Sequence, residues 1–143
     1  MSCRVLDVGS GAGLPGAVLA IMQPALQVTC IDAVAKKAGF IRQVAGELAI
    51  TNLSAEHGRV EDWKTAPFDV VTSRAFASLS EFTALTRHLL SESGVWLAMK
   101  GRVPDDEVAA LPPTVEVFHV EPLHVPGLDA QRCIVWMRKE GQA

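Results

Sequence analysis

The stretch that most constrains the fold of this chain is a glycine-rich loop directly after a short run of strand-forming residues. Residues 5–8 read Val-Leu-Asp-Val, and glycines stand at positions 9, 11 and 13. Glycines at such a turn let the backbone approach a ligand closely. Pro15 has a fixed φ and no N–H to leave unpaired, so a helix can begin there with its N-terminus directed at the bound group. The sequence therefore predicts a strand, a ligand-binding loop and a helix over residues 5–22.

A second strand and an acidic residue follow at the spacing of nucleotide-binding units. Residues 27–31 read QVTCI and end at Asp32. An acid about 20 residues beyond a glycine loop is where dinucleotide and nucleoside binders hold ribose hydroxyls. The next apolar residues recur at steps of three and four, which predicts a helix over residues 34–48.

The rest of the chain alternates strands with helices and then ends in a hairpin. We expect strands at 52–57, 68–72 and 95–99, and helices from Ser78 and over 104–111. A capping box, Ser78 with Glu81, starts the first of these helices. Gly94 is expected to break the chain before the strand at 95–99. The last strands, 115–121 and 133–138, are joined by a link too short for a crossover helix, so they are expected to be antiparallel.

This pattern predicts an α/β fold with a mostly parallel, doubly wound sheet and a C-terminal antiparallel hairpin. Such a sheet is covered by helices on both faces and binds its ligand at the carboxyl ends of the strands. The glycine loop, Asp32, Glu61, Arg74 and Lys100 are all expected at this edge. A chain of 143 residues is long enough for one domain, here residues 1–143.

The composition limits the cellular compartment and the binding partners that we expect for this chain. The formal net charge is −3, so any nucleic-acid contact must come from a local patch of cations. Three widely spaced cysteines, Cys3, Cys30 and Cys133, suit reduced, buried thiols in the cytoplasm, with no metal site. No apolar run approaches the roughly 20 residues of a membrane span, and no secretion signal opens the chain. We expect a cytoplasmic protein with no membrane contact.

The glycine loop by itself admits two kinds of ligand. Gly11, Gly13 and Gly16 satisfy the G-x-G-x-x-G pattern of nicotinamide dinucleotide binders. Asp7 stands just before the loop, where a carboxylate disfavours a pyrophosphate and favours a cation. This acid and the C-terminal hairpin both resemble the class I S-adenosylmethionine-dependent methyltransferases, whose ligand carries a sulfonium and an ammonium.

Four separated motifs make the resemblance much more specific. They are DVGSGAGLPG at 7–16, SRAFASL at 73–79, MKG at 99–101 and VPGLD at 125–129. In this order they resemble the 7-methylguanosine methyltransferases of small-subunit (16S) ribosomal RNA, the glucose-inhibited division protein B family, from Arg4 to Lys139. The resemblance implies a Rossmann-like class I fold, S-adenosyl-L-methionine as cofactor, and 16S ribosomal RNA or the small ribosomal subunit as partner. The helical segment that this family usually carries before the first strand is expected to be absent here.

The resemblance also implies which residues hold the methyl donor. The loop backbone would hold the methionine part, Asp32 the ribose, and Val60-Glu61 the adenine end, while Arg74 would border both donor and target base. The loop residues concerned are Gly9, Ser10, Gly11, Gly13 and Leu14. Simpler alternatives stay open: the glycines serve only a tight turn, Asp32 only caps the following helix, Glu61 is a solvated turn acid, and Arg74 forms a structural ion pair.

Fewer sequence features indicate which residues would contact RNA. Phe76 is similar to a family aromatic that packs by the base, although a core position is the alternative. Phosphate contacts are made by Lys and Arg, and the cations expected at this edge are Arg74, Lys100, Arg102 and Arg132. Ordinary surface charge is the alternative for Arg102 and Arg132.

The expected chemistry needs no acid–base residue. Guanine N7 has a free lone pair and no proton, so its attack on a sulfonium methyl depends on proximity and alignment. The four histidines are scattered, and no catalytic residue is identified. Two alternatives remain, a small-molecule methyltransferase of the same fold and a donor-binding but inactive truncated module. The sequence leaves the oligomeric state open.

Overall fold

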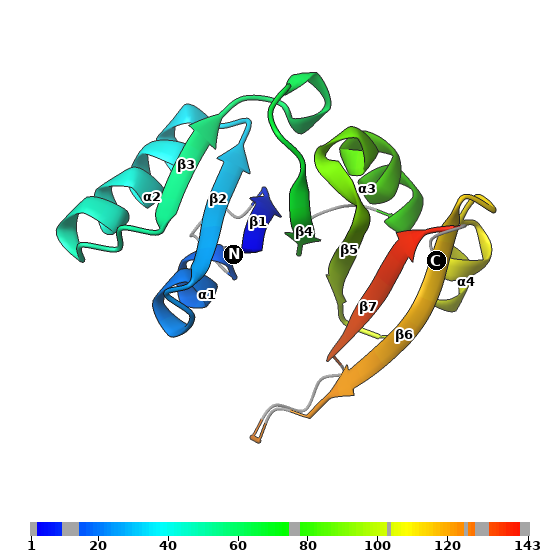
Figure 1. Ribbon diagram of the computed structural model, residues 1–143. Coiled ribbons are helices and arrows are strands. Elements are labelled where there is room, and N and C mark those ends of the chain that lie inside the picture. Colours follow the sequence, from blue (N-terminus) through cyan, green and yellow to red (C-terminus); the bar gives the residue numbers. More distant parts are fainter. Residues whose placement is uncertain are drawn as a thin grey trace.

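The computed structural model describes residues 3–9, 15–74, 78–102, 104–124, 126–127 and 132–140. Within them, one seven-stranded sheet runs through the molecule in the order β3-β2-β1-β4-β5-β7-β6 (Figure 1). The strands are β1 (Cys3–Val8), β2 (Leu26–Asp32), β3 (Leu53–His57), β4 (Phe68–Ser73), β5 (Leu90–Lys100), β6 (Val115–Leu123) and β7 (Arg132–Lys139). The helices are α1 (Gly16–Met22), α2 (Ala35–Glu47), α3 (Leu79–Thr86) and α4 (Asp105–Ala109), with 3-10 turns η1 (Val60–Asp62) and η2 (Arg87–Leu89).

The sheet topology confirms the prediction of a mostly parallel sheet closed by a hairpin. β1 pairs in parallel with β2 on one side and with β4 on the other, and β3 and β5 extend the two sides. β7 is antiparallel to both β5 and β6. The chain therefore builds outward in one direction from β1 to β3 and then in the other from β4. A ligand crevice is expected beside this switch point, at the carboxyl end of β1 and its neighbouring strands.

Helices cover opposite faces of the two halves of the sheet. On the β1–β2–β3 half, α1 and α2 pack over a cluster that includes Val5, Cys30 and Ile41. On the other face, α3 and the α4 region cover a larger cluster, in which Trp96 and Phe82 are essentially fully buried. Burial of these large apolar side chains, about 1.5–3 kcal/mol each, holds the two helix layers to the sheet.

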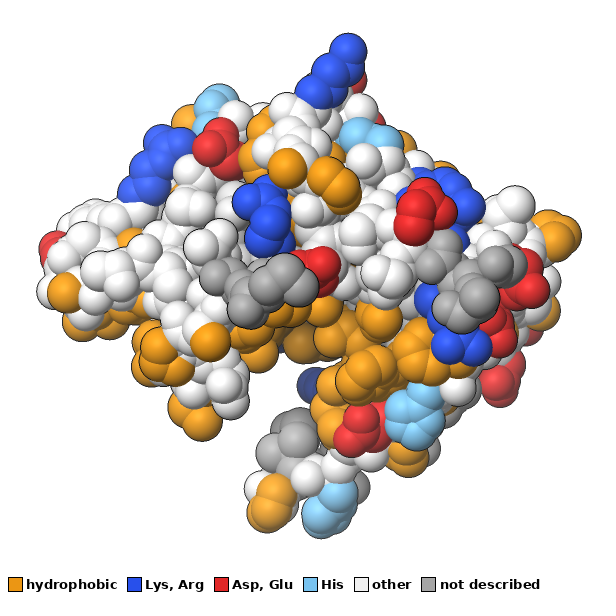
Figure 2. All heavy atoms as spheres, viewed as in Figure 1, with side chains coloured by type: hydrophobic (Ala, Val, Ile, Leu, Met, Phe, Trp, Pro, Cys, Tyr) orange, Lys and Arg blue, Asp and Glu red, His pale blue; other side chains and the backbone are white. Residues whose placement is uncertain are grey.

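One part of the sheet is not covered as the sequence predicted. In β5 and β7 the side chains that face α3 are buried, whereas the alternate ones are only half-buried, namely Leu97, Met99, Ile134 and Trp136. Leu97 lies opposite Trp136, and Met99 opposite Ile134. Figure 2 shows hydrophobic side chains gathered where these strands lie in Figure 1. Among the described residues no helix covers this face, because α3 and α4 both pack on the other one and the β6–β7 hairpin brings no crossover helix.

The region around Gly94 also differs from the prediction. The helix that follows Ser78 ends at Thr86, and the chain then passes through η2 directly into β5, which begins at Leu90. Gly94 therefore lies inside the strand and does not break the chain before it. Phe68 pairs with Leu90 but Val70 pairs with Val95, so the extra residues of β5 are absorbed by an irregular stretch of the ladder.

Two further predictions concern the cysteines and membrane-spanning helices. All three cysteines are free thiols, with Cys30 and Cys133 buried and Cys3 half-buried, as the sequence predicts. In the described ranges, no helix combines the length and the hydropathy required to cross a membrane.

Candidate functional site

The chain leaves β1 through a residue whose backbone conformation favours glycine. Gly9 has a φ of +68°, in the left-handed region, and its N–H donates to the carbonyl of Ile31 at 2.8 Å. This bond joins the ends of β1 and β2, so the chain turns sharply at the sheet edge. Four of the predicted loop residues lie outside the described residues: Ser10, Gly11, Gly13 and Leu14.

Asp7, the second-to-last residue of β1, is a completely buried carboxyl group. Its Oδ2 accepts the backbone N–H of Gly16 at 2.8 Å, which ties β1 to the first residue of α1. Burial raises the pKa of Asp7 to about 7, although the bond from Gly16 and the positive charge of Arg74 both lower it. Its Oδ1 and the hydroxyl of Thr72, the residue opposite it on β4, are buried without a hydrogen-bond partner in the part of the chain described.

A groove of about 520 Å³ opens at the carboxyl ends of β1 and β2. Gly9, Asp32, Val60 and Glu61 all line it, as expected from the sequence. Its remaining walls combine apolar and charged side chains, namely Val8, Ile31, Lys37, Arg59, Glu81 and Leu85. The groove therefore offers apolar surfaces for a flat base and carboxylates for hydroxyl or cationic groups.

Asp32 both caps the following turn and lines the groove. It ends β2, is 7% exposed, and its Oδ1 accepts the backbone N–H of Val34 at 2.9 Å. Its backbone carbonyl accepts the N–H of Gly58, which joins the end of β2 to the turn after β3. Asp32 does not cap helix α2 itself, because the N-cap of that helix is Val34 and no side chain caps it. The hydrogen bond from the Val34 N–H holds the carboxyl group at the groove wall.

The turn η1 brings the predicted Val60-Glu61 pair to the groove. Val60 is buried and belongs to the same apolar cluster as Val8 and Ile31, whereas Glu61 is exposed at the rim. η1 takes the place of a helix between β3 and β4, so this end of the groove is closed by one short turn. Ile31 and Val60 give this end of the groove an apolar lining, with Glu61 beside them.

Helix α3 supplies a wall that the sequence did not indicate. Glu81 and Leu85 line the groove from this helix, one turn apart. The sequence identified Glu81 only as the capping-box residue, and its N–H does donate to the Ser78 hydroxyl at 3.1 Å. Leu85 was not singled out from the sequence as a site residue. No local pattern indicates which side chains of this helix border a ligand.

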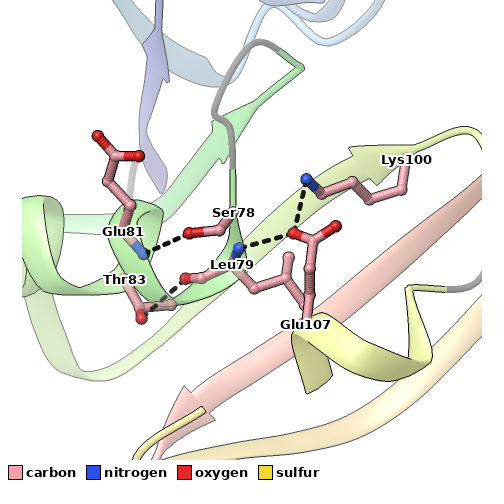
Figure 3. A network of polar contacts seen from close by, with 6 residues as sticks. All are labelled: Ser78, Leu79, Glu81, Thr83, Lys100 and Glu107. Atoms are coloured by element: carbon pink, nitrogen blue, oxygen red, sulfur yellow. Dashed lines mark hydrogen bonds and ion pairs between the residues drawn. The ribbon is translucent and has the colours of Figure 1, made fainter. Parts of the chain in front are cut away.

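Arg74 and Lys100 lie in a narrow recess that shares α3 with the groove. Ser78, Leu79 and Phe82 also line this recess. Lys100 is only 16% exposed, and its Nζ pairs with Oε1 of Glu107 at 3.0 Å (Figure 3). The structure thus brings Arg74 and Lys100 together, as expected. However, Lys100 is largely enclosed, whereas a cation that binds phosphate must be exposed. Glu107 was not singled out from the sequence.

The other predicted RNA-contact residues are not brought to the groove. Arg132 begins β7, is exposed, and lies opposite Leu123 of β6. Arg102 is exposed after β5, in a depression that also contains Asp105 and Asp106. Phe76 lies outside the described residues.

The chemistry of the groove fits a nucleoside better than a phosphate-rich dinucleotide. Asp32, Glu61 and Glu81 place three carboxyl groups around it, against the two cations of Lys37 and Arg59. Such a wall favours hydroxyls and positive charge and disfavours a pyrophosphate. Within the described residues, no group of His, Cys, Asp or Glu side chains is arranged to hold a metal ion.

Comparison with solved structures identifies the fold. A TrmN from Thermus thermophilus has a TM-score of 0.75 and 20% identity, over 96% of this chain and 44% of that one. A TehB-like SAM-dependent methyltransferase from Corynebacterium glutamicum has a TM-score of 0.72 and 16% identity, over 97% and 81%. The class I methyltransferase fold expected from the sequence is confirmed.

Comparison with known sequences identifies the family. A ribosomal RNA small subunit methyltransferase G from Methylibium petroleiphilum is 60% identical over 96% of this chain and 62% of its own length. Its counterpart from a Polaromonas species is 62% identical over 97% and 61%. The chain thus spans about three fifths of the length of these curated relatives. Because residues 1–135 also match the profile of rRNA small subunit methyltransferase G, the chain belongs to this family, as its motifs predicted.

Proposed function

We propose that this chain binds S-adenosyl-L-methionine in the groove and transfers its methyl group to N7 of a guanosine in 16S ribosomal RNA. The observation that carries the proposal is the groove itself, which lies at the carboxyl ends of β1 and β2 and is lined by Asp32, Val60 and Glu61. Membership of the family supports the RNA substrate. The residues 1–143 would form one donor-binding domain, and its place of action would be the cytoplasm, where small ribosomal subunits are made.

Each wall of the groove has a role in donor binding. Asp32 accepts hydrogen bonds from the ribose hydroxyls, because its carboxyl group is held at the wall by the Val34 N–H. Ile31, Val60 and Leu85 give the adenine ring apolar contacts, and Glu61 lies at its edge. Gly9, in a backbone conformation that favours glycine, lines the groove at the end of β1, and its backbone would border the methionine part.

Transfer requires alignment and no proton acceptor from the protein. The bound donor supplies an electrophilic methyl group on a sulfonium. Guanine N7 already carries a free lone pair, so the residues of this chain need only hold the base and exclude water, which contributes several kcal/mol. Arg74 is suited to this task because it stands at the end of β4, in the recess beside the groove, and its positive charge lowers the pKa of the buried Asp7.

Calorimetry and labelled transfer test the two halves of the proposal separately. The chain is titrated with S-adenosylhomocysteine, S-adenosylmethionine and NADH, and we expect binding of the first two only. It is then incubated with labelled donor and small ribosomal subunits, beside the longer Methylibium relative as a positive control. We expect label at N7 of a guanosine. Binding of NADH alone would contradict the donor assignment.

The alternatives are distinguished by the same assays. Methylation of free metabolites without label in the subunits would identify a small-molecule methyltransferase. Donor binding without transfer, where the longer relative is active, would identify a donor-binding module.

A further inference from the structure

Glu107 joins three elements around the site through a single carboxylate oxygen. Its Oε1 accepts the backbone N–H of Leu79, the first residue of α3, at 2.9 Å. The same oxygen pairs with the ammonium of Lys100, at the end of β5, at 3.0 Å. Figure 3 shows the Glu107 side chain reaching from α4 to both partners. One acid on α4 thus connects the start of α3 to the end of β5.

The start of α3 is held by two side chains from outside the helix body. Ser78 accepts the N–H of Glu81 at 3.1 Å, and Glu107 accepts the N–H of Leu79. The first N–H groups of a helix have no partner within it, so these two acceptors fix where α3 begins. A carboxylate acceptor at this end also interacts favourably with the helix dipole.

The position of α3 determines both cavities of the proposed site. Its residues Glu81 and Leu85 form one wall of the donor groove. Leu79 and Phe82, together with Ser78 just before the helix, line the recess that contains Arg74 and Lys100. A shift of the first turn of α3 therefore changes the donor side and the acceptor side together.

We propose that Glu107 is a positioning residue, which holds the first turn of α3 and the Lys100 ammonium in the geometry that donor binding and transfer require. The inference rests on the proposed function, and it adds to that function a residue that contacts neither donor nor base. The partners are enclosed, with side-chain exposures of 16% for Lys100 and 30% for Glu107, so solvent screens this pair less than an open surface pair.

The chain offers a matched control in a second ion pair. Glu116 and Arg138 pair at 2.8 Å across the β6–β7 hairpin, and both are about two fifths exposed, at 39% and 43%. Neither residue lines the groove or the recess. Replacing Glu116 therefore breaks a glutamate ion pair in a part of the sheet that borders neither cavity.

The test compares Glu107→Ala, Glu107→Gln and Glu116→Gln in this chain. We expect Glu107→Ala to weaken S-adenosylhomocysteine binding by about tenfold, because a charge-assisted bond to the helix start is lost. Glu107→Gln keeps a side-chain oxygen for the Leu79 N–H, so it should recover most of that affinity. Glu116→Gln should leave the affinity unchanged. Amide exchange at residues 79–82 should quicken in Glu107→Ala alone.

The transfer assay separates positioning from other roles. We expect the methyl-transfer rate at saturating donor to fall in both Glu107 variants, and more strongly in Glu107→Ala. A Glu107→Ala variant that melts earlier but keeps wild-type donor affinity and transfer rate would show a structural role only. A Glu107→Gln variant that gains RNA affinity with no loss of transfer would show that Glu107 merely masks Lys100. Either result overturns the inference.

Failure of the proposed function gives a different pattern. If the unmodified chain binds no S-adenosylhomocysteine, the donor assignment is wrong whatever Glu107 does. If the unmodified chain binds the donor and transfers the methyl group, and the Glu107 variants match it in both affinity and rate, only the positioning role is wrong.

Discussion

The backbone N–H of Gly16 donates to Oδ2 of Asp7 at 2.8 Å, and this bond leaves no space for a side chain at position 16. A Cβ there would lie 2.5 Å from the Cys30 sulfur and 2.8 Å from that same carboxyl oxygen. The bond fixes the start of α1 against β1, and so determines where the glycine loop between them begins and ends. A buried acid and a close backbone contact therefore hold the end of β1 and the start of α1 together.

Replacement of Gly16 tests this close packing. Gly16→Ala should destabilise the chain by about 2–3 kcal/mol, because the added methyl group overlaps a sulfur and a buried carboxyl group. Gly39→Ala is the control, since nothing lies within 4 Å of a Cβ at that position in α2, and a gain of about 0.5–1 kcal/mol is expected. Urea unfolding at pH 7 measures both. Equal effects of the two substitutions would contradict the proposed overlap.

The buried carboxyl group makes stability depend on pH. The pKa of Asp7 is raised from 3.8 to about 7 in the folded chain, so the folded state binds the proton more tightly than the unfolded state. Ionisation of Asp7 therefore opposes folding: the destabilisation is absent below about pH 4, grows as the pH rises, and is complete above about pH 7. It amounts to about 4 kcal/mol.

Asp7→Asn removes this titration while keeping an oxygen for the Gly16 N–H. The variant should be more stable than the unmodified chain at pH 8 and similar at pH 4, with a flatter dependence of the unfolding free energy between them. Urea unfolding from pH 4 to pH 8 measures the difference. Parallel curves for the two proteins would show that Asp7 does not titrate in this range.

The groove predicts different effects for three acids, of which Asp32 and Glu61 line it and Asp62 does not. Asp32→Asn should weaken S-adenosylhomocysteine binding by about tenfold or more, because a charge-assisted bond to the ribose is replaced by a neutral one. Glu61→Gln should have a smaller effect, since that side chain is exposed. Asp62→Asn is the control, because Asp62 lies in the same turn as Glu61 and does not line the groove. Calorimetry measures the three affinities.

Arg74→Ala should reduce methyl transfer more than donor affinity. Arg74 lines the recess beside the groove, and its charge also lowers the pKa of Asp7. Its loss should therefore raise the pKa of Asp7 further and shift the pH dependence of unfolding upward. Single-turnover transfer and calorimetry with the same protein give the comparison. Equal losses in rate and affinity would mean that Arg74 only builds the donor site.

A hydroxyl group in the core should contribute measurably to stability. Thr86 is completely buried, donates to the carbonyl of Phe82, and accepts the indole N–H of Trp96 at 2.9 Å. Thr86→Val leaves that N–H buried without a partner and should cost about 1–3 kcal/mol. Thr83→Val is the matched control, because the Thr83 hydroxyl only donates to helix carbonyls. Thermal unfolding of the two variants tests the difference.

Local sequence signals determined most of the sheet and one side of the site. The strand, glycine loop and helix at residues 5–22, the acid at the end of β2 and the capping box at Ser78 each depend on residues a few positions apart. Propensity and side-chain periodicity act over that distance, and the parallel strands then bring Gly9, Asp32 and Glu61 to one edge. The four motifs could likewise identify the family from the sequence, because each is a short continuous stretch and the four follow one another in the family's order.

The tertiary structure alone decided which side chains meet across the sheet. Glu107 lies 28 residues from Leu79, and the bond between them exists only because α3 and α4 pack on the same face. That choice of face also made Glu81 and Leu85 a wall of the groove, enclosed Lys100, and left Leu97 and Trp136 half-buried on the other side. No signal along the chain specifies these relations, because they follow from how whole elements pack to bury their apolar faces.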